Sequence, residues 1–134
     1  MSTTQRVTVA LLDRIQGAFN QHDVDAILSY FHDEGEWLMA RGPDPWEAKR
    51  LRGKRAIGDV LSARYKVIPD MRWEDMSHFI AADGRKACSE WTVRGTPNDG
   101  AAPIELLGCD IWTFTDGAVV CKDTYWKFVD PPSG

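Results

Sequence analysis

Residues 108–127 constrain the fold of this chain more than any other stretch. Two apolar runs, rich in β-branched and aromatic residues, flank a Thr-Asp-Gly sequence at positions 115–117. This pattern predicts an antiparallel β-hairpin. We expect a three-residue loop between Phe114 and Ala118, with Gly117 in the left-handed conformation that a side chain would resist. The sequence therefore predicts that a sheet forms the C-terminal part of the fold.

A single acid and a single base are expected on one face of this hairpin. The register of a three-residue loop pairs four sets of positions: Asp110 with Lys122, Trp112 with Val120, Gly108 with Thr124, and Leu106 with Trp126. The rest of that face is aromatic or apolar, and a carboxylate there is costly unless it is paired or used. A loop one residue shorter would put Asp123, instead of Lys122, on the face of Asp110. In either case the pattern predicts a pocket beside Asp110.

Composition and charge exclude several classes of protein. The 134 residues fit one domain, residues 1–134, with a flexible tail at about 130–134. A net charge of −4 argues against a nucleic-acid partner. No apolar stretch has the length of a membrane span, and the first residues lack the apolar core of a signal peptide. Three cysteines without a Cys-x-x-Cys pair are typical of reduced thiols, so we expect a cytoplasmic protein.

The remaining segments predict three helices, one short strand and a pair of longer strands. A capping box at Ser2 and Gln5 and an apolar face that ends at Phe19 predict the first helix. Asp23 has the position of an N-cap for a short second helix. The other expected elements are a strand at 36–41, a surface loop at 42–52, a helix at 54–66, and strands at 70–82 and 86–94. The inner side of the third helix carries Ile57, Val60, Leu61, Arg64 and Tyr65.

These elements together predict an α+β fold, in which a curved antiparallel sheet wraps over three N-terminal helices and encloses a pocket. The second face of the closing hairpin is also largely apolar and includes Leu107, Cys109, Ile111, Val119, Cys121 and Tyr125. Such a face needs a cover, and a second copy of the same sheet is the simplest one. We therefore expect a homodimer that packs through the sheet.

Two stretches resemble a known superfamily. The sequence from Asn20 to Trp37 and that from Leu107 to Lys127, in the order helix, helix, strand, helix, meander, are similar to the nuclear transport factor 2-like superfamily. Within it the chain is most similar to SnoaL-like proteins, which include polyketide cyclases, and more distantly to ketosteroid isomerases and limonene epoxide hydrolases. The resemblance implies a cone-shaped α+β fold around a deep pocket. It specifies the fold and not the reaction, because the superfamily includes both enzymes and non-enzymes.

The site residues of these relatives carry over only in part. Asp110 matches the protonated aspartic acid with which ketosteroid isomerases hold an oxyanion, and Trp126 matches a pocket-lining tryptophan. Ile15 stands in place of their tyrosine, and Met39 or Ala40 stands in place of their general base. Thr124 stands where limonene epoxide hydrolases have an aspartate. The resemblance thus argues against both of these specific activities.

Three residues are the candidates for chemistry. If Lys122 lies at ion-pair distance, Asp110 stays charged and fixes strand register; if Lys122 turns away, burial suits Asp110 to act as a general acid or base. Lys122 itself could bind an anionic or enolate group, or form a Schiff base. His78 could reach the pocket as a proton shuttle. No histidine pair has chelating spacing, so we expect neither a metal nor another cofactor.

A set of apolar and aromatic residues is expected to line the pocket: Ile15, Phe19, Tyr30, Trp37, Met39, Leu61, Tyr65, Trp91, Trp112, Thr124 and Trp126. Such walls suit a small, flat, hydrophobic ligand, such as a cyclic molecule, that one or two polar groups anchor. We therefore predict a cofactor-free enzyme or binder of a small hydrophobic molecule, with acid/base chemistry centred on Asp110. The alternative is a non-catalytic ligand-binding or dimerisation module of the same fold.

Overall fold

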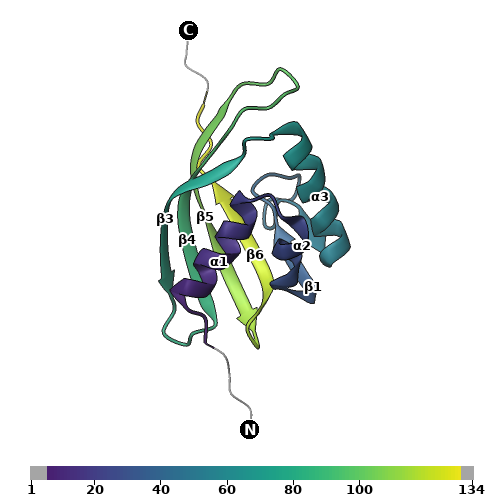
Figure 1. Cartoon of the computed structure of the whole chain (residues 1–134). Helices are drawn as coiled ribbons and strands as arrows, with labels where there is room; N and C mark the ends of the chain where they lie inside the picture. Colours follow the sequence, from purple (N-terminus) through teal and green to yellow (C-terminus); the bar gives the residue numbers. More distant parts are fainter. Residues whose placement is uncertain (1–5, 131–134) are drawn as a thin grey trace.

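The computed structural model describes residues 6–130, and Figure 1 shows their arrangement. The described elements follow the chain in this order: α1 (Val9–Asn20), α2 (Val24–Ser29), β1 (Phe31–Leu38), β2 (Arg50–Arg52), α3 (Lys54–Val67), β3 (Arg72–Ile80), β4 (Lys86–Gly95), β5 (Ile104–Thr115) and β6 (Ala118–Trp126). The predicted α+β class is confirmed. The predicted tail, apart from residue 130, and the Ser2–Gln5 capping box lie outside the described residues.

The sheet has the strand order β2-β1-β6-β5-β4-β3. Four of its five pairings are antiparallel, as predicted, but β1 runs parallel to β6, with Trp37 beside Lys122. The expectation of a purely antiparallel sheet was therefore wrong. The reason is that the chain leaves β1 through β2 and α3 before it builds the four-strand meander, and the last strand of that meander returns beside β1 in the same direction.

The first strand and the loop after it differ from the prediction. The strand begins at Phe31, which pairs with Val119 of β6, and not at position 36. The segment predicted as loop 42–52 contains β2, whose Leu51 is buried and pairs with Trp37. Both strand segments form because the sheet supplies hydrogen-bond partners and a buried face that come from distant parts of the chain.

The helices begin where short polar side chains cap them. Thr8 accepts a hydrogen bond from the backbone N–H of Leu11 and caps α1. Asp23 caps α2 through the N–H of Ala26, as predicted.

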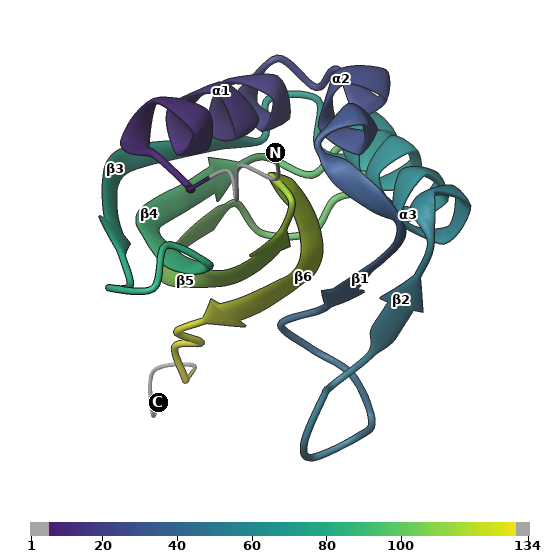
Figure 2. The same ribbon diagram turned by 90° about the horizontal axis from the view of Figure 1, so that it is seen from below.

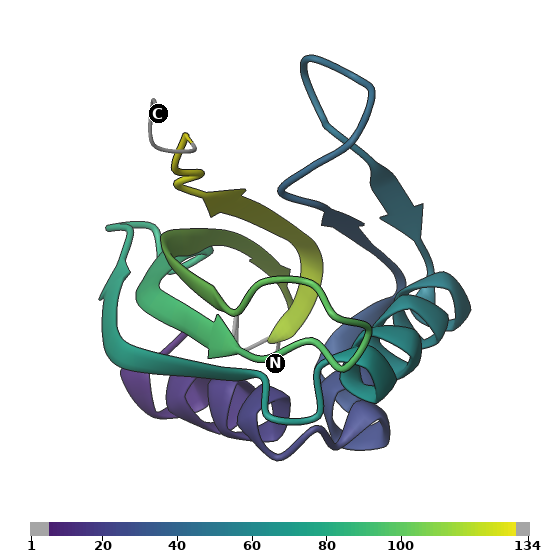
Figure 3. The ribbon, with the colours of Figure 1, turned by 90° about the horizontal axis from the view of Figure 1, so that it is seen from above.

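Figures 2 and 3 show the sheet curving around α1, whereas α3 lies beside β1 and β2. The core lies between helices and sheet, where the ring of Phe19 meets Trp73 and Trp112 edge-on. Within residues 6–130, none of the helices has both the length and the apolar character needed to cross a bilayer.

The closing hairpin has a shorter loop than predicted. Thr115 pairs with Ala118, so that only Asp116 and Gly117 form the turn, and both have positive φ, 51° and 78°. This is the conformation of the type I′ turns that Asp-Gly favours. The pairing shifts between Thr113 and Phe114, which leaves one extra residue, Val120, as a bulge on β6.

The bulge decides which side chains face Asp110. The two-residue loop alone would have turned Asp123 to that face, as a shorter loop implies. The extra residue at Val120 reverses this change, so Lys122 and Thr124 share the face of Asp110. Directly opposite Asp110, however, lies Thr124, and Lys122 lies opposite Trp112. The predicted face is confirmed, but the predicted partners were wrong by two positions.

Candidate functional site

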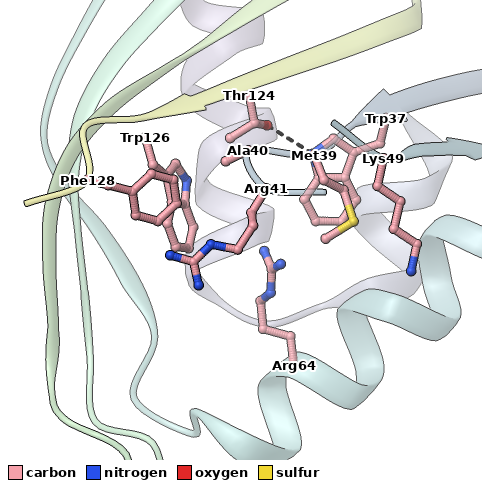
Figure 4. Close-up of a pocket in the computed structure, with 9 residues that line it drawn as sticks. All are labelled: Trp37, Met39, Ala40, Arg41, Lys49, Arg64, Thr124, Trp126 and Phe128. Carbon is pink, nitrogen blue, oxygen red and sulfur yellow. Dashed lines mark hydrogen bonds between the residues drawn. The ribbon is translucent and has the colours of Figure 1, made fainter. Parts of the chain in front are cut away.

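A pocket of about 330 Å³ opens between α3, the ends of β1 and β6, and the segments that follow these strands. Figure 4 shows its lining: Trp37, Met39, Ala40, Arg41, Lys49, Arg64, Thr124, Trp126 and Phe128. Three aromatic rings and a methionine supply apolar walls. Among the described residues of the lining there are also three cationic side chains and no carboxylate. The volume falls in the range of about 300–1,000 Å³ that is usual for small-molecule sites.

Asp110 lies behind this pocket and does not line it. Only 1% of the residue is exposed. Its Oδ2 accepts a hydrogen bond from Trp91 Nε1 at 3.0 Å, and its Oδ1 accepts one from Thr124 Oγ1 at 2.6 Å. Lys122 Nζ lies 2.9 Å from the same Oδ1. The carboxylate is therefore both neutralised and hydrogen-bonded, as a buried charge requires.

Lys122 is the counter-ion of this carboxylate and is 4% exposed. Its Nζ also donates to Thr124 Oγ1 at 2.9 Å and lies over the rings of Trp37 and Phe19, at 4.6 and 5.1 Å from their centroids. Burial lowers the pKa of Lys122 below its usual value, and the negative charge of Asp110 opposes that shift. An amine so enclosed is an ion-pair partner and offers no open path for attack on a ligand.

Thr124 connects the buried ion pair with the pocket. It lines the pocket, donates its hydroxyl proton to Asp110, and accepts hydrogen bonds from Lys122 and from Trp37 Nε1, the latter at 2.9 Å. Figure 4 shows the bond between Thr124 and Trp37 at the pocket wall. A hydroxyl with these three partners has no free hydrogen-bonding capacity. Any exchange of protons between Asp110 and a ligand would pass through this hydroxyl.

His78 belongs to a different network. Its Nδ1 lies 2.8 Å from Ser89 Oγ and its Nε2 lies 2.9 Å from Asp13 Oδ1 on α1. Ser89 also accepts a hydrogen bond from Trp112 Nε1. His78 therefore ties β3 to α1 and does not line the pocket of Figure 4. The sequence allows His78 as a proton shuttle that could reach the pocket, but it does not show that Asp13 of α1 binds this imidazole.

The structure divides the residues expected along the pocket into two groups. Four of them line it: Trp37, Met39, Thr124 and Trp126. Six others are buried in the hydrophobic core, and a seventh, the half-buried Tyr30, packs against that core; these are Ile15, Phe19, Tyr30, Leu61, Tyr65, Trp91 and Trp112. The hydroxyl of Tyr65, for example, donates a hydrogen bond to the carbonyl of Phe19. Burial raises the pKa of this tyrosine hydroxyl. The residues of the second group lie in or against the core, and not along the pocket, because α1 and α3 pack directly on that part of the sheet.

The sequence interpretation missed the cationic part of the pocket. Arg64 stood out as a charge on the inner side of a predicted helix, and that signal could have placed it in a pocket. Arg41 and Lys49 lie on the connection between β1 and β2, where no periodic pattern gives their direction. Phe128 follows the last strand and carries no signal of its own. Within residues 6–130 no three metal-ligating side chains are gathered in a way that could hold an ion.

Comparison with known proteins identifies the type of fold first. At 20% identity the chain is similar to a protein from Xanthomonas campestris assigned as a polyketide cyclase, with a TM-score of 0.75 over 88% of both chains. An assigned isomerase from Bacillus subtilis has 18% identity and a TM-score of 0.74, over 88% of this chain and 84% of that one. A third similar structure is that of SalBIII, an epoxide hydrolase/cyclase-like enzyme with a role in pyran ring formation in the polyether salinomycin. It has 17% identity and a TM-score of 0.72 over 88% of both chains. These similarities show that the chain shares the α+β fold of these proteins.

The family follows from the sequence itself. The profile of the SnoaL-like domain matches residues 12–121, and the chain therefore belongs to the SnoaL-like family. No match was found among curated proteins. The match begins within α1, ends in the first half of β6 and includes Asp110, whereas Lys122, Thr124 and Trp126 lie beyond its end.

Proposed function

We propose that this protein binds a small, largely apolar molecule in the pocket between Trp37 and Trp126. The observation that carries the proposal is the pocket itself: about 330 Å³, with walls of aromatic rings and Met39, on a SnoaL-like fold. Flat apolar molecules gain from contact with such walls through burial and through ring stacking. The assignments of the similar structures, polyketide cyclase and isomerase, agree with a small-molecule ligand.

A pocket-filling variant tests this proposal. Ala40 lines the pocket, so Ala40→Phe places a ring inside it, whereas Ala101→Phe adds the same ring to an exposed loop. Calorimetric titration with 2-naphthamide, a neutral flat probe, should show binding to the wild type and to Ala101→Phe. Ala40→Phe should lose it. If the wild type binds neither 2-naphthamide nor the corresponding anion 2-naphthoate, or if Ala40→Phe binds as well as the wild type does, the pocket is not the ligand site.

Acid/base catalysis is the second candidate function, and one observation favours it. The hydroxyl of Thr124 lies at the pocket and is bonded at 2.6 Å to Asp110. If a ligand displaces one of the two hydrogen bonds that Thr124 Oγ1 accepts, a proton taken from that ligand would pass through this hydroxyl to Asp110, which would make Asp110 the base and Thr124 the relay. Removal of a proton next to a carbonyl is the reaction that needs the least further equipment.

The catalytic hypothesis has a direct assay. The α-protons of 2-tetralone exchange with deuterium in heavy water, and proton NMR follows the loss of their signal. We expect the wild type to accelerate this exchange over buffer, Thr124→Ser to retain the acceleration, and Thr124→Val and Asp110→Asn to lose it while 2-naphthamide still binds. If the wild type does not exceed buffer, or if Thr124→Val is fully active, acid/base chemistry through Asp110 is refuted.

We further propose that two copies pack through the outer face of the sheet. Phe79, Leu107, Ile111 and Tyr125 are exposed on strands β3, β5 and β6, on the face that the described helices leave open. Light scattering at micromolar concentration should give twice the mass of one chain. Leu107→Glu should shift the protein to the monomer, whereas Trp46→Glu, in the exposed β1–β2 connection, should not. A monomeric wild type would contradict the proposal.

A further inference from the structure

Arg64 is a partly buried cation that forms no ion pair with any residue in the described range 6–130. It projects from α3 into the pocket, and its guanidinium lies 5.2 Å from the ring of Trp37 and 5.8 Å from the ring of Trp126. Burial lowers the pKa of Arg64 below its usual value, and no described carboxylate offsets this effect. An arginine remains charged despite such a shift. The chain therefore holds a positive charge at the pocket without a partner of its own within residues 6–130.

Arg64, on helix α3, differs in this respect from the four arginines of the sheet. Arg50 and Arg52 pair with Glu36, and Arg72 and Arg94 pair with Glu74, at distances of 2.9–3.2 Å. Those pairs lie on the surface, where a pair stabilises little and its absence costs little. The less exposed Arg64 would gain most from a partner, because a desolvated charge loses its hydration without compensation.

The other polar features of the pocket have the same sign. Arg41 lies over the ring of Phe128 at 4.4 Å. Figure 4 shows its guanidinium beside Trp126 and Phe128, and that of Arg64 in the space between Trp126 and Trp37. Lys49 adds a third cation to the lining. The Nε1 of Trp126 is buried and donates to no described acceptor. Three cations and an unused donor all favour a ligand that brings negatively charged oxygen atoms.

We propose that the ligand of this pocket is an organic carboxylate: a flat apolar body packed between the aromatic walls, with its carboxylate group paired to the guanidinium of Arg64. The proposal rests on the proposed function, since it names the chemical class of the molecule that the pocket binds. Arg41 and Lys49 are exposed residues at the pocket mouth and would attract the anion, although the whole chain carries a net charge of −4. The same charges disfavour a cationic ligand.

Two probes of nearly equal shape separate this proposal from the one on which it rests. Calorimetric titrations compare 2-naphthoate with 2-naphthamide, whose aromatic bodies are identical and whose charges differ. Charge-assisted pairing with a desolvated arginine predicts that wild type binds 2-naphthoate about ten- to hundredfold more tightly. In Arg64→Gln the two probes should bind within about threefold of each other. Arg55→Gln, on the exposed side of the same helix, should keep the wild-type preference.

Each outcome has a definite meaning. If both probes bind the wild type equally, the carboxylate proposal is overturned while the small-molecule pocket stands. If neither probe binds, both proposals fail. If the preference for 2-naphthoate survives in Arg64→Gln, the charge is recognised elsewhere and the assignment to Arg64 is wrong. Circular dichroism and the retained affinity of Arg64→Gln for 2-naphthamide show whether that variant is folded.

Discussion

Removal of Lys122 tests the central interpretation of the buried network. In Lys122→Met the carboxylate of Asp110, 1% exposed in the wild type, loses its counter-ion and keeps only the hydrogen bonds from Trp91 and Thr124. Breaking a buried pair on one side costs about 3–5 kcal/mol. Because two donors remain, we expect a loss near the lower end, about 3 kcal/mol. That is a large part of the stability of a small domain, about 5–15 kcal/mol.

A double-mutant cycle measures the pairing itself. Asp110→Asn leaves the cation of Lys122 near three aromatic rings, and we expect it to cost about 2–4 kcal/mol. The double variant Asp110→Asn/Lys122→Met carries neither charge of the pair. Its loss of unfolding free energy should therefore fall short of the sum of the two single losses by at least about 2 kcal/mol. Urea unfolding, followed by circular dichroism at fixed protein concentration, gives these values. The control Lys127→Met, at an exposed lysine, should change the unfolding free energy by less than about 0.5 kcal/mol.

The pH dependence of Asp110→Asn has a defined sign. Burial already holds the pKa of Lys122 below the ordinary value of a lysine, and removal of the opposing carboxylate lowers this pKa further. The native chain then releases this proton at a lower pH than the unfolded chain, so the unfolded state binds more protons in between. Stability therefore rises with pH in that interval, and the loss measured at pH 7 should shrink towards pH 9. The interpretation of Asp110 and Lys122 as a buried ion pair is refuted if the free-energy losses of the two single variants add up in the double variant. It is also refuted if Lys122→Met loses less than about 1 kcal/mol.

Three further predictions follow from other features. Gly108→Ala would place a methyl carbon 2.7 Å from the ring of Trp91. This overpacking should lower the free energy of unfolding, measured in urea, by about 1–3 kcal/mol. An unchanged free energy of unfolding would contradict the close packing of Gly108 against Trp91. Burial raises the pKa of the Cys88 thiol to about 12. At pH 8, mass spectrometry should therefore show that iodoacetamide labels Cys88 about a thousandfold more slowly in the folded protein than in urea, and the labelling rate of the folded protein should rise with pH. Equal labelling rates in the folded and unfolded protein would contradict this prediction. Asp23→Ala removes the cap of α2 and should cost about 1 kcal/mol, with Asp25→Ala as the control.

Much of the fold could be predicted because local patterns specify it. The apolar spacing around Leu61 predicted a helix at 54–66, and α3 spans Lys54–Val67. Asp23 and Gly117 have the roles that their chemistry favours, a helix cap and a left-handed turn position. The start of β1 and the short strand β2 were missed because neither has a pattern of its own. Both depend on pairing with strands that are distant in sequence.

The candidate site was predicted less completely for a related reason. Periodicity tells which residues face inward, but it does not separate a solid core from a cavity. Phe19 and Trp112 therefore could not be distinguished from Trp37 and Trp126, although the first two pack in the core and the last two line the pocket. The loop residue Arg41 has no period from which its direction could be read.

The sequence by itself determined the α+β class, the closing hairpin, and the placement of Asp110 on an apolar face of that hairpin. These properties follow from alternation, turn chemistry and caps, which act over a few residues. The tertiary structure decided the register, because the bulge at Val120 sets Thr124, not Lys122, opposite Asp110. It also decided that this acid lies behind the pocket and that Arg64 faces into it. Such choices depend on how separate elements pack, and no local pattern records that.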